Sequence, residues 1–117
     1  MEATYLIVFA LVGLAGGLGA VIRAILTSWN GWLPWGLFLT NSLAAGLVAW
    51  WLSGPTLTAD YLLVITVGLA GGMSTFSTVA KASFDFYHRG RLLQSMLSLA
   101  ANTVLPLVAV MLATALR

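Results

Sequence analysis

The sequence predicts an all-α membrane protein with four transmembrane helices. Of its 117 residues, 61% are hydrophobic and 7% are charged, whereas a soluble domain carries about 25% charged residues. The apolar residues form four long segments, at 4–27, 33–53, 61–86 and 92–116. Each is long enough to cross the hydrocarbon layer as a helix, which takes about 20 residues. Because the connections are short, we expect residues 1–117 to form a single four-helix domain.

The few polar residues argue against an enzyme. The chain has no cysteine, one histidine, His88, and three acidic residues, Glu2, Asp60 and Asp85. Neither a metal-ligand cluster nor an acid–base pair can be assembled within the membrane from these side chains. The pI of about 9.5 reflects a few basic residues near the predicted helix ends, not a surface for nucleic acid. We therefore expect neither catalysis nor a nucleic-acid partner.

The first span combines closely spaced glycines with one basic residue near its end, in the stretch GLAGGLGAVIRA, residues 13–24. Gly13 and Gly17 are four residues apart, and such a pair of small residues predicts the close approach of another helix. Arg23 has two interpretations. Its guanidinium reaches the lipid headgroups, or it lies at the mouth of an aqueous vestibule and raises the local anion concentration.

Polar side chains interrupt the second and fourth spans. Asn41 lies a few residues after the start of the second span, while the fourth contains Ser98, Asn102 and Thr103. Ser98 and Asn102 are four residues apart and share one helical face. These groups either hydrogen-bond neighbouring helices or present amide and hydroxyl donors to an anion.

The third span is predicted to break between Gly71 and Phe76, within the stretch GGMSTFST, residues 71–78. Each of its two glycines disfavours a helix by about 1 kcal/mol. Irregular backbone at membrane depth persists only where protein buries it or a wet cavity solvates it. The freed carbonyls can coordinate a cation, and the new helix N-terminus favours an anion. The hydroxyls of Ser74, Thr75, Ser77 and Thr78 surround this point. Together with the electropositive edge of the Phe76 ring, they suggest a path for a small anion.

Three of these stretches together resemble the motifs of the CrcB/Fluc fluoride channel family. The matching stretches are GAVIR at 19–23, GLFLTN at 36–41 and GGMSTFST at 71–78. Their order and spacing extend over essentially the whole chain, and the last of them is the most specific. The resemblance implies small four-span bacterial proteins that assemble as antiparallel, dual-topology dimers with two pores.

The resemblance also implies a role for individual residues. Asn41 is the expected pore asparagine, and Phe76 the first phenylalanine of an aromatic box that fluoride passes edge-on. The carbonyls of Gly71 and Ser74, from both subunits, are expected to hold a structural sodium ion (Na+) at the dimer centre. The remaining expected residues are the polar track of Ser77 and Thr78, the vestibule Arg23, and, by a looser match, the polar face of Ser98, Asn102 and Thr103.

The chain departs from the family pattern at three places. Val79 stands where the family usually has a second box phenylalanine, and Leu37 where it commonly has threonine. Alanine, at Ala44 and Ala45, replaces a glycine that usually follows the asparagine. Arg23, Lys81, Arg89 and Arg91 also fall on one side of a four-span topology, a bias that a dual-topology protein should lack. These departures leave room for a non-conducting subunit, or for half of a heterodimer whose paralogous partner supplies missing pore residues.

The expected function is that of a fluoride-selective channel in the cytoplasmic (inner) membrane of a prokaryote. It gives passive fluoride export, and its expected partners are fluoride, membrane lipid and a second copy or a paralogue. The main rival from another class is a small multidrug-resistance-type proton-coupled exporter, which needs a carboxylate in its first span. Because residues 4–27 contain no acidic residue, that rival is disfavoured.

Overall fold

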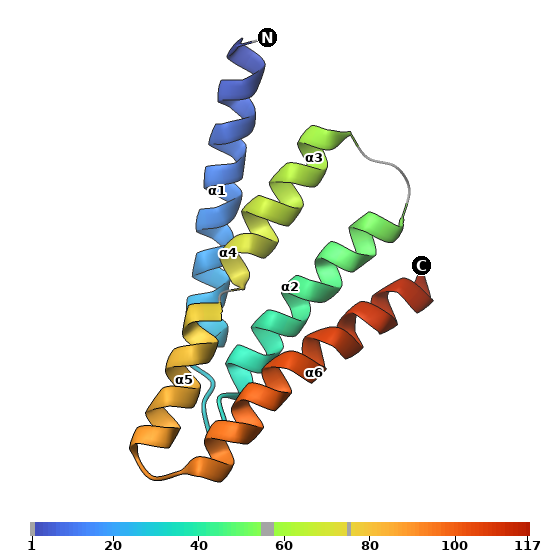
Figure 1. The fold of residues 1–117 in the computed structure, drawn as a ribbon. Coiled ribbons are helices and arrows are strands. Elements are labelled where there is room, and N and C mark those ends of the chain that lie inside the picture. The colour runs from blue at the N-terminus through green and yellow to red at the C-terminus, as the bar shows by residue number, and fades with distance from the viewer. Residues whose placement is uncertain (1, 55–57, 75) are drawn as a thin grey trace.

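The computed structural model of the chain describes residues 2–54, 58–74 and 76–117, and every regular element in these ranges is helical. The elements are arranged as Figure 1 shows. In chain order they are α1 (Glu2–Leu26), α2 (Trp35–Ser53), α3 (Ala59–Leu63), the π-helical segment η1 (Val64–Ala70), α4 (Gly71–Met73), α5 (Phe76–His88) and α6 (Leu92–Leu116).

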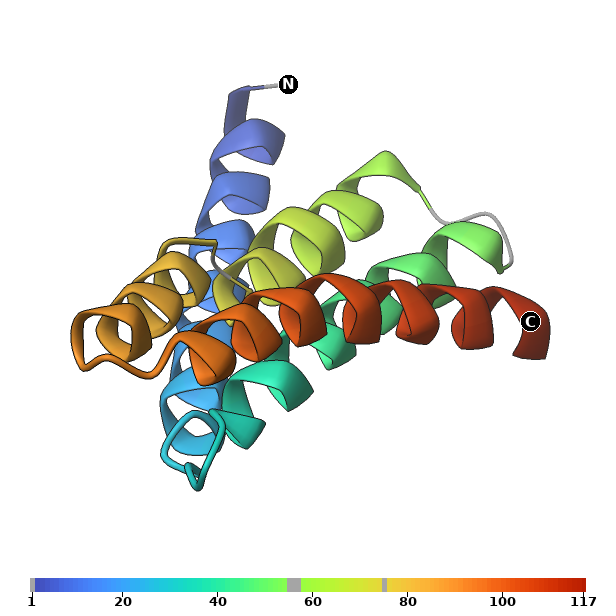
Figure 2. The ribbon, with the colours of Figure 1, turned by 60° about the horizontal axis from the view of Figure 1, so that its bottom comes forward.

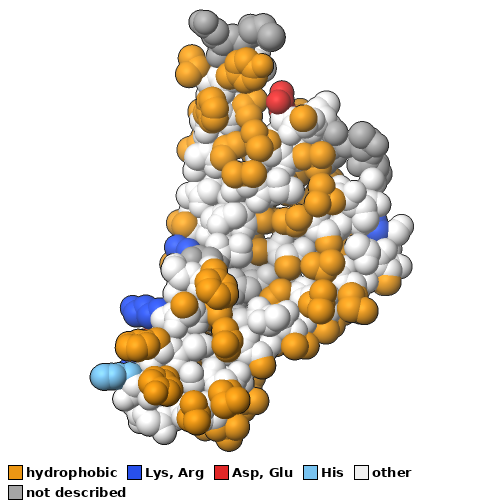
Figure 3. All heavy atoms as spheres, viewed as in Figure 1, with side chains coloured by type: hydrophobic (Ala, Val, Ile, Leu, Met, Phe, Trp, Pro, Cys, Tyr) orange, Lys and Arg blue, Asp and Glu red, His pale blue; other side chains and the backbone are white. Residues whose placement is uncertain are grey.

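The prediction of four membrane-spanning helices is confirmed in length and composition. The spans are Ala3–Leu26, Trp35–Ser53, Ala59–His88 and Leu92–Leu116, with mean hydropathies between 1.3 and 2.3. Their ends differ from the predicted ones by no more than two residues, because hydropathy falls sharply at the connecting loops. Apolar side chains also dominate the face seen in Figure 3, as expected of a surface in contact with lipid.

The helices form two packed groups that share the third span. α2 lies along α6, α1 packs against η1 and α4, and α5 packs against α6 (Figures 1 and 2). The most buried span is α2, of which 39% is buried, whereas only 6% of α1 is. The molecule is elongated, with extents of 55 × 31 × 17 Å. The polar residues of α2 therefore lie between helices, while α1 keeps most of its surface exposed.

Glycines allow α1 to approach the third span, but they are not the predicted pair. A Cβ added at Gly19 would overlap the carbonyl oxygen of Leu69, and one added at Gly72 would overlap that of Gly16. Outside their own stretch of helix, no described atom lies within 4 Å of a Cβ added at Gly13 or Gly17. The prediction of close contact through Gly13 and Gly17 is therefore wrong for contacts within one chain. The contact lies on a neighbouring face of the same helix.

The third span changes its backbone geometry at the stretch that the sequence singled out. η1 is π-helical, a conformation that is rare and frequent at functional sites. After α4 ends at Met73, Ser74 has an extended backbone with φ −103° and ψ 144°, and α5 begins at Phe76. The predicted break includes Thr75, which lies outside the described residues, so the break itself stays a prediction.

Arg117, at the end of α6, contacts the C-terminal part of α2. The Nε of Arg117 donates to the carbonyl of Trp50 at 3.2 Å, and its guanidinium lies 4.4 Å from the centre of the Trp50 ring. A Cβ at Gly54 would overlap this guanidinium. A cation over an aromatic face is attracted to it, so this contact helps to hold the register of α2 against α6.

Candidate functional site

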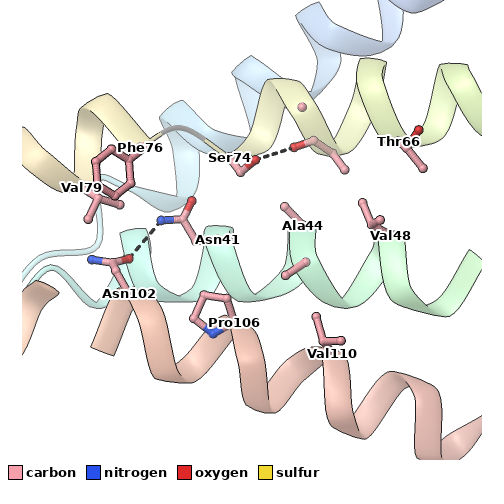
Figure 4. Close-up of a pocket in the computed structure, with 13 residues that line it drawn as sticks. Asn41, Ala44, Val48, Thr66, Ser74, Phe76, Val79, Asn102, Pro106 and Val110 are labelled. Atoms are coloured by element: carbon pink, nitrogen blue, oxygen red, sulfur yellow. Dashed lines mark hydrogen bonds between the residues drawn. The ribbon is translucent and has the colours of Figure 1, made fainter. Parts of the chain in front are cut away.

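An open groove of about 550 Å³ lies between α2, α6 and the third span. Figure 4 shows it from the side. Its polar side chains are Asn41, Thr66, Ser74 and Asn102, and the rest of its lining carries no charge. The other lining residues are Ala44, Ala45, Val48, Ala70, Gly71, Phe76, Val79, Pro106 and Val110. A neutral groove with few polar groups suits a small ion that must be solvated without being held tightly.

Asn41 and Asn102 form a hydrogen-bonded amide pair in this groove. Asn41, which is 8% exposed, donates from Nδ2 to Oδ1 of Asn102 at 3.0 Å. Asn102 in turn donates from Nδ2 to the carbonyl oxygen of Ser98 at 3.0 Å. The pair shows that Asn41 links α2 to α6, one of the two interpretations that its sequence position left open. Because an amide nitrogen carries two hydrogens, the second N–H of Asn41 is not used in this bond.

Asn102 belongs to a polar stripe along α6, in which it is half-buried and the other two members are buried. Gln94, Ser98 and Asn102 follow one another at four-residue intervals and therefore share one face. Ser98 is fully buried, and Gln94 donates from Nε2 to the carbonyl oxygen of Trp32 at 2.6 Å. The sequence reasoning missed Gln94. The four-residue period that joins Ser98 to Asn102 would have found it one turn earlier.

Phe76 and Val79 lie at the end of the groove that holds the amide pair (Figure 4). Phe76 is 77% exposed in the single chain. Val79, at the position where the resemblance implies a second phenylalanine, is 5% exposed and forms part of the wall. One chain thus contributes one aromatic ring to this end of the groove.

Several other residues expected at the pore do not line this groove among the described residues. Arg23 is half-buried in the last turn of α1, Ser77 is exposed at the start of α5, and Thr78 is half-buried one residue later. Thr103 is exposed and donates to the carbonyl of Leu99 at 3.0 Å. Ser98 is fully buried and does not line the groove. The pore roles of these residues stay predictions.

Gly71 and Ser74, whose carbonyls the resemblance implies for a sodium ion, lie together at the groove. Both residues line the groove, and Gly71 is exposed. The extended backbone of Ser74 turns its carbonyl away from the direction that the α4 carbonyls share. Neutral carbonyls from unwound backbone are the ligands that hold Na+ in membrane proteins. The sodium site itself stays a prediction.

Comparison with known proteins gives a consistent result. A family model described as "CrcB-like protein, Camphor Resistance (CrcB)" matches residues 10–114. A protein of Pectobacterium atrosepticum named "Fluoride-specific ion channel FluC" is 36% identical over 97% of this chain and 96% of its own length. Proteins of the same name from Psychrobacter cryohalolentis and Pyrococcus furiosus are each 34% identical, over 82% and 81% of this chain and 88% and 83% of their own lengths.

The family match covers most of the chain, including the residues of the groove. It spans Asn41, the glycine-rich stretch of the third span and the polar stripe of α6. The motifs GAVIR, GLFLTN and GGMSTFST indicate the same family. The chain belongs to the CrcB family.

Proposed function

We propose that this chain is a subunit of a fluoride-selective channel that lets fluoride leave the cell down its gradient. The observation that carries the proposal is the Asn41–Asn102 pair in the wall of a groove that bears no charge. Relatives that match 97% and 82% of this chain carry the name of a fluoride-specific ion channel. The described residues that line the groove include no fixed positive charge to trap an anion, so a fluoride ion can both enter and leave.

Within the groove, the protein replaces part of the hydration shell of the ion. The free N–H of Asn41 is a donor to fluoride, and the hydroxyls of Ser77 and Thr78 extend the path along α5. The edge of the Phe76 ring carries partial positive charge and offers a weakly attractive wall. A small ion benefits most from such close donors, so fluoride is favoured over the larger chloride.

The working unit is an antiparallel dimer, with a sodium ion held at its centre by the Gly71 and Ser74 carbonyls of both subunits. Two features support this assembly. Gly71 and Phe76 are exposed beside the groove in the single chain, and one chain supplies too few carbonyls for the ion. The sodium ion neutralises carbonyl dipoles at the helix break and stabilises the dimer. The channel resides in the cytoplasmic membrane of a prokaryote.

Fluoride efflux from liposomes tests the proposal. Liposomes that contain the purified protein and are loaded with potassium fluoride will release fluoride when valinomycin provides a path for potassium, as a fluoride electrode reads. Liposomes loaded with potassium chloride will hold their chloride under the same conditions. Retention of fluoride by the wild-type protein would show that the homomeric channel is wrong. Release that is restored by co-expression with a paralogue would show a heterodimer instead.

Phe76 provides a prediction about the wall of the path. We expect Phe76→Ile to slow fluoride release by about tenfold, because isoleucine is apolar but lacks the electropositive ring edge, worth about 1 kcal/mol or somewhat more. The thermal stability of the protein in detergent should be nearly unchanged, since the ring is exposed in the single chain. Phe84→Ile is the matched control, because Phe84 is likewise exposed on α5 and lies outside the groove lining. Equal efflux rates for the two variants would contradict the role of Phe76.

A further inference from the structure

The exposed side of α5 is divided lengthwise into a polar half and an apolar half. With about 3.6 residues per turn, the exposed residues of this helix fall within about half of its circumference. Ser77, Lys81 and Asp85 follow one another at four-residue intervals along one edge of that arc. The polar half consists of Ser77, Lys81, Asp85 and His88, and the apolar half of Phe76, Ala80, Phe84 and Tyr87.

The polar half of α5 connects the groove with the end of the third span. Phe76 lines the groove, and Ser77 is the next residue along the chain. From there α5 runs away from the groove to the turn that precedes α6 (Figure 1), where Arg89 and Arg91 are exposed. Polar and charged side chains are unfavourable in contact with lipid and in membrane proteins face a water-filled cavity or the protein interior. The polar half therefore indicates that water reaches this side of α5.

Lys81 carries a positive charge on this stripe at some distance from the end of the span. It lies seven residues before His88, the last residue of the span, which corresponds to about 10 Å along the helix. Side chains of a helix are directed toward its N-terminus, which in α5 is the end at Phe76, beside the groove. A lysine that reached the headgroups beyond His88 would have to extend in the opposite direction. The geometry of the helix therefore favours a position of the ammonium group nearer the groove.

No acidic group neutralises Lys81 in the described part of the chain. Asp85 is one turn away on the same stripe, but a base that precedes an acid is the less favourable order for a pair on a helix. The two side chains form no ion pair within those residues. An exposed and unpaired ammonium group requires water around it, because its transfer to lipid is unfavourable.

We propose that the polar half of α5 lines a water-filled vestibule of the groove, and that Lys81 concentrates fluoride in it. A fixed positive charge raises the local concentration of anions. The described lining of the groove beyond it is uncharged, so the ion is attracted to the entrance without being trapped in the narrow part. The inference rests on the proposed fluoride function and extends it to a residue outside the groove.

A single thiol at position 81 tests whether water reaches this side of α5. Because the chain contains no cysteine, Lys81→Cys has one reactive site, and water-soluble methanethiosulfonate reagents modify a thiol as its thiolate. In intact liposomes, this variant should react at least tenfold faster than Ala80→Cys. Ala80 is the matched control, since it is exposed at nearly the same depth but belongs to the apolar half. Gel filtration of both variants checks that they are folded.

The charge attached to that thiol tests the role of Lys81. Protein with Lys81→Cys is modified in detergent by a cationic trimethylammonium reagent or by an anionic sulfonate reagent and then reconstituted. At about 10 mM potassium fluoride, the cationic form should release fluoride at the wild-type rate and the anionic form about sevenfold more slowly. One unit charge about 7 Å from an anion in water changes its local concentration about threefold, and the two forms differ by two charges. In about 1 M potassium gluconate, where the Debye length is about 3 Å, the difference should disappear.

The outcomes separate this inference from the channel function. Equal reaction rates for Lys81→Cys and Ala80→Cys would show that lipid or a second copy covers the polar half, and would overturn the vestibule. Equal efflux from the cationic and anionic forms would overturn the role of the charge. If the wild-type protein releases fluoride in either case, the channel function stands without this vestibule. Absence of wild-type efflux would defeat the channel function and the role of Lys81 together, while the reaction rates would still show whether water reaches position 81.

Discussion

Asn41→Asp will reduce fluoride release from liposomes by about a hundredfold or more. A carboxylate has nearly the size of the amide but lacks its N–H donors, and a hydrogen bond to a charged group contributes about 1.5–3 kcal/mol. The substitution also places two acceptors in contact, since Asn41 donates to Oδ1 of Asn102. When ionised, the carboxylate adds a negative charge to a site that is 8% exposed, where repulsion of an anion is poorly screened.

The efflux assay with a fluoride electrode measures this effect, with protein orientation and amount matched between preparations. Asn30→Asp is the control, because it makes the same chemical change in an exposed loop at the end of α1. The control should release fluoride at the wild-type rate. A rate for Asn41→Asp within threefold of its control would mean that the Asn41 donors do not face the ion.

Gly72→Ala should destabilise the folded protein by about 3 kcal/mol, at the upper end of the usual effect of overpacking. A methyl group there would overlap the carbonyl oxygen of Gly16, which belongs to the α1 backbone and cannot move aside as a flexible side chain does. Gly19→Ala should behave in the same way, because its Cβ would overlap the carbonyl oxygen of Leu69. α1 and the third span would have to separate.

Thermal unfolding in detergent, followed by circular dichroism and by the loss of the monodisperse peak in gel filtration, measures the change. Gly13→Ala, in α1 like Gly19→Ala, is the matched control, since no described atom outside its own stretch of helix lies within 4 Å of its added Cβ. Alanine has the higher helix propensity, by up to about 1 kcal/mol, so this control should be as stable as the wild type or more so. Equal melting temperatures for Gly72→Ala and Gly13→Ala would show that α1 does not approach the third span as closely as described.

The positions of the four spans could be predicted from the sequence because membrane insertion depends on local properties. Length and apolar content decide whether a segment crosses the hydrocarbon layer, and both can be read from consecutive residues. The same holds for the stretch at 71–78, where glycines and hydroxyls mark an irregular backbone without reference to the rest of the chain. The extended backbone of Ser74 and the π-helical turns of η1 lie in and just before this stretch.

The contacts between spans could not be predicted from the sequence in the same way. The sequence offered several glycines in the first span, and the spacing rule selected Gly13 and Gly17. The contact in fact uses Gly16 and Gly19 opposite Gly68 and Gly72. A pattern of small residues specifies that a helix can be approached closely, but the face that is approached depends on where the partner helix lies.

By itself, the sequence determined four spans, an uncharged interior and the motifs by which the chain resembles its family, because each depends on composition or on order along the chain. Which polar groups form hydrogen bonds with one another depends on the tertiary structure. It paired Asn41 with Asn102, which are 61 residues apart, added Gln94 to the polar stripe of α6, and left Ser98 Oγ and Asn41 Oδ1 without partners among the described residues. Hydrogen bonds require atoms within about 3 Å and in the right direction, and that proximity comes from the packing of α2 against α6.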